Sequence, residues 1–165
     1  MKGRTFHTTS DAATPSRLLI AEMYKAAADA KEPPWLRTPP ASLNEAALRA
    51  AYARGRVLKW VRISRFRGGS WQQIAVALRI SRQAAWSRFR QQPIIRNVHD
   101  DERLLTGALK VLGLWGIRMQ EAEKWTEELV HQARVAGWSW GRIGSELGVR
   151  RQTAWERFGK SRYTE

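Results

Sequence analysis

The stretch SWQQIAVALRISRQAAWSRF at residues 70–89 returns 69 residues later as SWGRIGSELGVRRQTAWERF at residues 139–158. Half of the aligned positions are identical, and the alignment needs no gap. A repeat of this kind indicates that one chain carries two copies of the same supersecondary unit. In both copies the apolar spacing is that of two short helices joined by a tight turn, which predicts two helix-turn-helix units.

The apolar positions of each copy are those that hold such a helix pair together. In the first copy Ile74 and Leu78 lie one turn apart on the supporting helix, Ile80 fills the turn, and Ala85 and Phe89 face inward from the second helix. The second copy has the equivalent residues Ile143, Leu147, Val149, Ala154 and Phe158.

Small or flexible residues are expected where the helices cross and where the chain turns. Ala75 and Gly144 occupy the crossing position, and Gly148 suits the left-handed backbone that ends the supporting helix. Arg79 stands at that position in the first copy, where it carries a small backbone penalty.

Composition favours a polyanionic partner. The 165 residues carry a formal net charge of +14, and no Asp or Glu occurs between Ala46 and His99, a stretch that includes the first copy. Strong positive charge indicates a nucleic acid or a membrane surface, and its overlap with the motif favours nucleic acid.

The chain has no cysteine, no apolar run long enough to span a membrane and no signal peptide. We therefore expect a soluble, cytoplasmic, nucleoid-associated protein that does not bind a membrane.

The predicted fold class is all-α, because no stretch shows convincing strand alternation. We expect a flexible basic arm at 1–13, an N-terminal helical domain at 14–92 with a Pro-rich linker at 32–41, a second linker at 93–99 and a C-terminal helical domain at 100–165. A capping box at Ser42–Glu45 predicts a helix over 42–66. In the second half, Gly113 and Gly116 predict a break between a helix ending near Leu114 and a longer helix at about 117–136.

The consensus of the two copies is Gly-x-Ser-Trp-x-x-Ile-Gly-x-x-Leu-Gly-Val-x-Arg-Gln-x-Ala-Trp-x-Arg-Phe. It resembles the helix-turn-helix of small DNA-binding proteins of actinobacteria and their phages, and more remotely region 4 of bacterial sigma factors. The resemblance covers about 22 residues per copy, and it implies a helical fold and DNA contact. The first copy departs from it at Ala75 and Arg79, and the second has Arg150 where the common pattern has serine.

The second helix of such a motif lies in the major groove, with its N-terminal residues facing base edges. The outward positions predicted to contact bases are Ser81, Arg82, Gln83, Trp86 and Ser87 in the first copy, and Arg150, Arg151, Gln152, Trp155 and Glu156 in the second. Arginine pairs well with guanine and glutamine with adenine, although an arginine here equally fits a phosphate contact. The two tryptophans in this set either meet thymine methyls or fold back on their own unit, whereas Trp71 and Trp140 are expected in the core.

Phosphate contacts require charge or helix N-termini beside the second helix. The candidates are Ser70, Arg88, Arg90, Ser139 and Arg157, together with Arg56, Lys59 and Arg62 from the preceding long helix. The long-helix row fits a solvated face as well as it fits phosphate. Lys2 and Arg4 belong either to an arm for the minor groove or to a disordered tail.

Catalytic and metal-binding patterns are lacking. His7, His99 and His131 are isolated, and no phosphate-binding glycine loop or nucleophile elbow occurs. We therefore expect no enzyme, no metal and no cofactor.

The sequence predicts a sequence-specific binder of double-stranded DNA, a transcriptional repressor whose two units read a bipartite, asymmetric site from one chain. Three alternatives stay open: a DNA-packaging or recombination accessory protein that self-associates, a nucleoid-associated protein with little sequence preference, and a sigma-like adaptor that contacts RNA polymerase through the acidic residues between Glu121 and Glu128.

Overall fold

The structure is a computed structural model that describes residues 32–93 and 105–160, and every regular element in these two ranges is a helix. The all-α prediction is confirmed. The predicted arm at 1–13 and the first residues of the two predicted domains, 14–31 and 100–104, lie outside the described residues. The elements in chain order are the 3-10 helix η1 (Pro34–Arg37) and the α-helices α2 (Leu43–Phe66), α3 (Trp71–Leu78), α4 (Arg82–Phe89), α5 (Leu105–Val135), α6 (Trp140–Leu147) and α7 (Arg151–Phe158).

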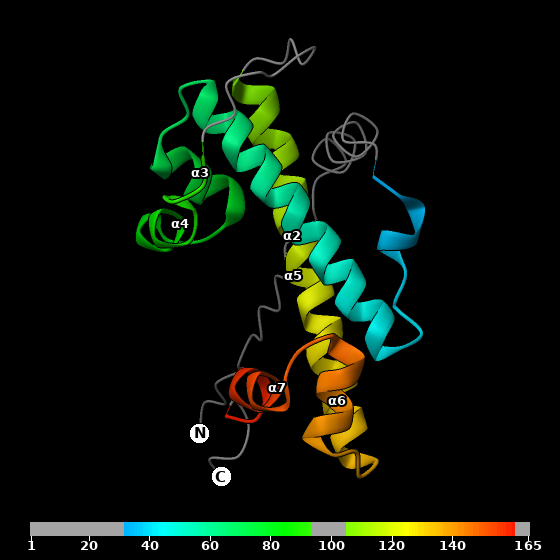
Figure 1. Cartoon of the computed structure of the whole chain (residues 1–165). Coiled ribbons are helices and arrows are strands. Elements are labelled where there is room, and N and C mark those ends of the chain that lie inside the picture. The colour runs from blue at the N-terminus through cyan, green and yellow to red at the C-terminus, as the bar shows by residue number, and fades with distance from the viewer. Residues whose placement is uncertain (1–31, 94–104, 161–165) are drawn as a thin grey trace, which may run out of the picture.

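Two long helices form the spine of the molecule. α2 and α5 pack against each other in opposite directions, with α3 and α4 near one end of the pair and α6 and α7 near the other (Figure 1). Among the described helices none has both the length and the apolarity to cross a membrane.

The predicted break at Gly113 and Gly116 is wrong, because both glycines lie inside the continuous helix α5. Their role is packing. A Cβ on Gly116 would stand 2.9 Å from Leu78 Cδ2, and one on Gly113 would stand 3.3 Å from the carbonyl oxygen of Ala77. The two glycines therefore let the C-terminal end of α3 approach the backbone of α5.

The helix starts agree closely with the capping signals. Ser70 forms the predicted capping box: its hydroxyl accepts from the Gln73 amide, and the Gln73 side chain accepts from the Ser70 amide. At α2 only half of the expected box forms, since Ser42 accepts from the Glu45 amide while the Glu45 carboxylate accepts from the Ala41 amide at 2.8 Å. That bond and the contact with Arg49 lower the pKa of Glu45.

The turns also follow the sequence. Arg79 and Gly148 both adopt the left-handed conformation, with φ of 55° and 68°. Ile80 packs against the core as predicted, but Val149, which is one carbon shorter, is 37% exposed and does not fill its turn.

Two apolar clusters hold the short helices to the spine. The first contains Val61, Ile74 and Ala85, joined by Leu112 and Trp115 from α5. The second consists of Val130, Ile143, Ala154 and Leu43, the last of which comes from α2. Each half of the chain thus contributes to the core of the other.

The Pro-rich segment 32–41, expected to be a linker, contains η1 and packs on the spine. Leu36 is buried in the first cluster. The buried Glu32 carboxylate accepts hydrogen bonds from Arg37 and from Arg118 of α5. Burial by itself lowers the pKa of Arg118, but the bonds to Glu32 and Glu121 outweigh burial and raise it.

Candidate nucleic-acid interface

The repeat extends beyond the aligned motif into the last turn of each long helix. Arg65 of α2 donates to the carbonyl of Gly69 at 2.7 Å and lies 4.7 Å from the centre of the Trp71 ring. Arg134 of α5 makes the equivalent bond to the Trp138 carbonyl and lies 4.9 Å from the Trp140 ring. We call residues 65–90 the first unit and residues 134–160 the second unit.

These arginines fix the position of each short helix relative to its long helix. Each guanidinium joins the end of the long helix to the backbone just before the next helix, and each also covers a tryptophan. Trp71 and Trp140 are half-buried and pack against the two clusters, as expected for core residues. The motif alignment missed Arg65 and Arg134 as a pair, but the signal was present, because they share the 69-residue offset of the repeat.

The loop that joins the short helices is tight in both units. In the first unit the amide of Ile80 donates to the Ala75 carbonyl at 3.0 Å, and in the second the amide of Val149 donates to the Gly144 carbonyl at 2.8 Å. Ser81 caps α4 by accepting from the Ala84 amide, whereas Arg150 begins α7 without a side-chain cap. The Arg150 side chain is therefore not committed to its own helix start.

All ten residues predicted to contact bases are exposed. They are Ser81, Arg82, Gln83, Trp86 and Ser87 in the first unit and Arg150, Arg151, Gln152, Trp155 and Glu156 in the second. The residues that hold α4 and α7 in place, Ala85 and Ala154, are fully buried. Each helix thus presents one polar face outward and anchors the opposite face through a small side chain.

The two outward tryptophans each lie near a cation that follows the end of their own helix. Trp86 and Trp155 are 40% and 42% exposed, and neither joins a core cluster. Arg90 lies 4.4 Å from the Trp86 ring centre and Lys160 lies 5.5 Å from the Trp155 ring centre. Each unit therefore places a cation against an exposed indole, an arrangement that combines an aromatic face with positive charge.

Sequence comparison of the two copies missed Lys160. The residue equivalent to Arg90 is Gly159, so the second cation is displaced by one position. Gly159 leaves room for the Trp155 ring, because a Cβ at this position would stand 2.8 Å from Trp155 Cδ1.

The outward polar residues of α4 and α7 make different side-chain contacts. In the second unit Gln152 Nε2 donates to Glu156 Oε1 at 2.9 Å, one turn further along α7. Ser87 stands at the position of Glu156 in the first unit and cannot form an equivalent carboxylate contact. Arg82, Gln83 and Trp86 line an open depression on the surface of α4.

The predicted phosphate-contacting residues divide into two groups. Six of them are exposed: Ser70, Arg88, Arg90, Ser139, Arg157 and Lys59. Arg56 and Arg62 are half-buried: the Arg56 guanidinium lies 5.0 Å from the Trp115 ring centre, and Arg62 Nε donates to the Pro93 carbonyl at 2.8 Å.

The structure therefore does not present Arg56, Lys59 and Arg62 as one exposed row. Residues three apart on an α-helix do not point in the same direction, because one turn takes 3.6 residues. Arg56 therefore contacts α5, and Arg62 contacts Pro93, which follows the first unit.

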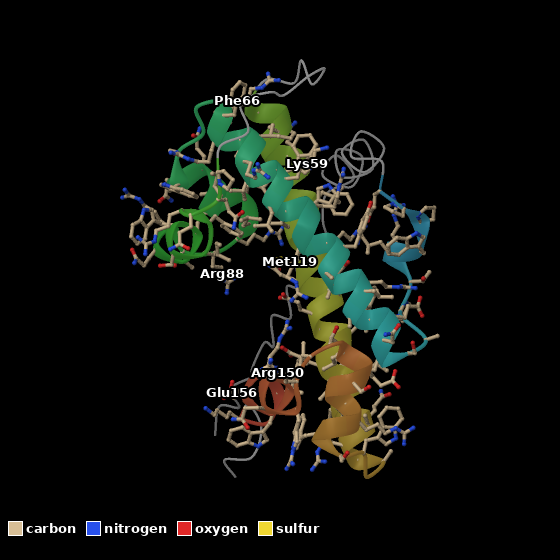
Figure 2. All side chains as sticks on the ribbon, in the orientation of Figure 1. Lys59, Phe66, Arg88, Met119, Arg150 and Glu156 are labelled. Atoms are coloured by element: carbon tan, nitrogen blue, oxygen red, sulfur yellow. The ribbon has the colours of Figure 1, made fainter. Side chains whose placement is uncertain are left out.

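α4 and α7 lie on the same side of the α2–α5 pair, one toward each end (Figure 1). Arg88 of α4 and Glu156 of α7 lie on that side, whereas Lys59 lies over the long helices (Figure 2). The fold thus brings α4 and α7 to one side of the molecule (Figure 1).

The chain matches no family model, and it shows no match to a curated protein or a solved structure.

Proposed function

We propose that this protein binds double-stranded DNA in a sequence-specific manner and acts as a transcriptional repressor, with α4 and α7 as the recognition helices of two helix-turn-helix units on one chain. The observation that carries the proposal is the pair of equivalent helices on one face, each with an exposed Arg-Gln pair at its start. The start of the second helix is the part of a helix-turn-helix that faces base edges.

The chemistry of the face fits a duplex. Arginine is suited to the two acceptors of guanine, and glutamine to the donor and acceptor of adenine. Exposed basic residues around the helices, with Ser70 and Ser139 at helix starts, supply the contacts that set register on the phosphates. Repression is the simplest consequence of such binding, because an occupied duplex excludes other proteins from the same site.

The adaptor alternative has less support. It requires an acidic face on α5, yet three of its carboxylates contact basic side chains of the chain itself. Glu121 pairs with Arg118, Glu123 lies near Arg54 and Arg157, and Glu128 lies 3.9 Å from Lys124. These pairs reduce the negative potential available to a partner.

Selection of bound fragments from a pool of random duplexes tests the proposal. We expect enrichment of a defined bipartite sequence. Arg82→Ala and Arg151→Ala are each expected to relax the preference in a different part of that sequence, at a cost of about 1–3 kcal/mol of discrimination.

Lys124→Ala is the matched control, because it removes one positive charge from an exposed site on α5 and breaks only a weak surface ion pair with Glu128. It should leave the preference intact. A pool that emerges without any enriched sequence would contradict sequence-specific binding, and affinity that falls equally with salt on every duplex would favour a nucleoid-coating role.

A further inference from the structure

Each long helix contributes a leucine to the apolar cluster of the opposite half of the chain. Leu43 of α2 packs in the second cluster with Val130, Ile143 and Ala154, whereas Leu112 of α5 packs in the first cluster with Val61, Ile74 and Ala85. Leu43 and Leu112 are related by the same 69-residue offset as the other three pairs. Each leucine therefore supports the unit of the opposite half.

Contacts with the backbone carbonyls of α3 and α6 show the same exchange. Asn44 Nδ2 of α2 donates to the Glu146 carbonyl of α6 at 3.3 Å. The equivalent position in α5 is Gly113, whose Cβ would stand 3.3 Å from the Ala77 carbonyl of α3, and Ala77 is the equivalent of Glu146. At the level of elements, α3 packs on α5 and α6 packs on α2.

This reciprocal pattern identifies the symmetry of the repeat. If the two halves were related by a simple shift along the chain, Leu43 would pack on its own unit. A mutual exchange, in which each half supports the other, is the mark of an approximate twofold axis, as in an isologous dimer interface. The antiparallel arrangement of α2 and α5 fits such an axis (Figure 1).

From this we infer that one chain reads an imperfect inverted repeat, with its internal twofold axis aligned on the dyad of the duplex. The inference rests on the proposed DNA-binding function and adds the orientation of the two half-sites. Helix-turn-helix dimers read inverted half-sites because the protein twofold axis coincides with that of the operator. This protein has the same relation inside one polypeptide.

The length of the spine sets the spacing of the half-sites. Leu43, under the second unit, and Val61, under the first unit, lie eighteen residues apart on α2. Eighteen residues of α-helix span about 27 Å. This separation is of the order of one turn of B-DNA, about 34–36 Å, and well short of two turns. The half-site centres are therefore one turn apart, on one face of the duplex.

The two half-sites share some positions and differ at others. Arg82 and Gln83 have identical counterparts in Arg151 and Gln152, so the bases that they read are the same in both half-sites. Ser87 and Glu156 differ, and Glu156 accepts from Gln152, so the bases near them differ. The repeat is inverted but imperfect.

The test uses the full chain and synthetic duplexes that carry the two selected half-sites in inverted or direct orientation, with centres 10 or 15 base pairs apart. We expect the inverted duplex at 10 base pairs to bind one chain per duplex. Direct orientation, or the added half turn, should weaken binding by at least tenfold, to the level of a duplex with one half-site. Mass measurement of the complex gives the stoichiometry, and competition titration gives the affinities.

The outcomes separate this inference from the proposed function. Specific binding that is tightest on direct repeats, that ignores orientation, or that requires two chains per inverted site would overturn the inference and leave DNA reading intact. A protein that shows no preference among duplexes of any sequence would fail the proposed function itself.

Discussion

At the scale of single residues, the best-defined strain is at Arg79. It is the only residue other than glycine with positive φ in the described ranges, and its counterpart Gly148 adopts nearly the same conformation. Left-handed backbone costs a non-glycine residue about 1–2 kcal/mol, which a glycine at this position would not incur. Glycine also makes the unfolded chain more flexible, and this stabilises the unfolded state by about 0.4–1 kcal/mol. Arg79→Gly should therefore raise the free energy of unfolding by about 0.5–1 kcal/mol.

Urea denaturation without DNA measures this change. The reverse substitution, Gly148→Arg, is the matched variant, and it should lower the free energy of unfolding by a similar amount. A loss of stability in Arg79→Gly would mean that the exposed arginine side chain makes a stabilising interaction that exceeds its backbone strain.

At the scale of elements, the contact between α3 and α5 depends on a buried glycine. Gly116→Leu places a large side chain where even a Cβ would approach Leu78 to 2.9 Å. Overpacking of this kind costs about 1–3 kcal/mol, so we expect Gly116→Leu to lower the free energy of unfolding by that amount.

Gly55→Leu is the control, because Gly55 is exposed inside α2 and has no neighbouring atom within 4 Å of a Cβ. Leucine is the better helix former by close to 1 kcal/mol, so Gly55→Leu should stabilise the protein by about 0.5–1 kcal/mol. Thermal unfolding of the two variants separates the effect of close packing at Gly116 from the effect of helix propensity, which both substitutions share. Equal shifts in both variants would show that the α3–α5 contact is loose.

The same glycines show where sequence reasoning succeeded and where it failed. Capping serines, apolar spacing and the left-handed turn positions are local signals, and they predicted two short helices in each copy, where α3, α4, α6 and α7 lie. From sequence alone, a glycine in a helical stretch is consistent with a helix break and with close helix packing. Only the position of α3 against α5 shows that Gly113 and Gly116 are packing sites. The ten outward residues followed from the geometry of the helix-turn-helix motif, whereas Lys160 was missed because its counterpart in the first copy is Gln91, which is not basic.

At the scale of the whole molecule, the two halves of the chain do not form independent cores. Leu112 belongs to the second half by sequence but is fully buried under the first unit, and Leu43 is its counterpart under the second unit. This exchange was not predictable from the repeat, because the repeat shows that the units are alike but not which long helix supports each one.

Because of this exchange, a cavity-forming substitution in one half should destabilise the short helices of the other half. Leu112→Ala removes a buried side chain and should lower the free energy of unfolding by about 2–5 kcal/mol. Because the cavity lies under the first unit, amide hydrogen exchange should show the larger loss of protection in α3 and α4, which belong to the other half. Leu43→Ala should give the reverse pattern, with the larger loss in α6 and α7. If each variant instead loses protection mainly in the unit of its own half, or equally in both units, the two cores are not exchanged, and the twofold arrangement that orients the half-sites fails with them.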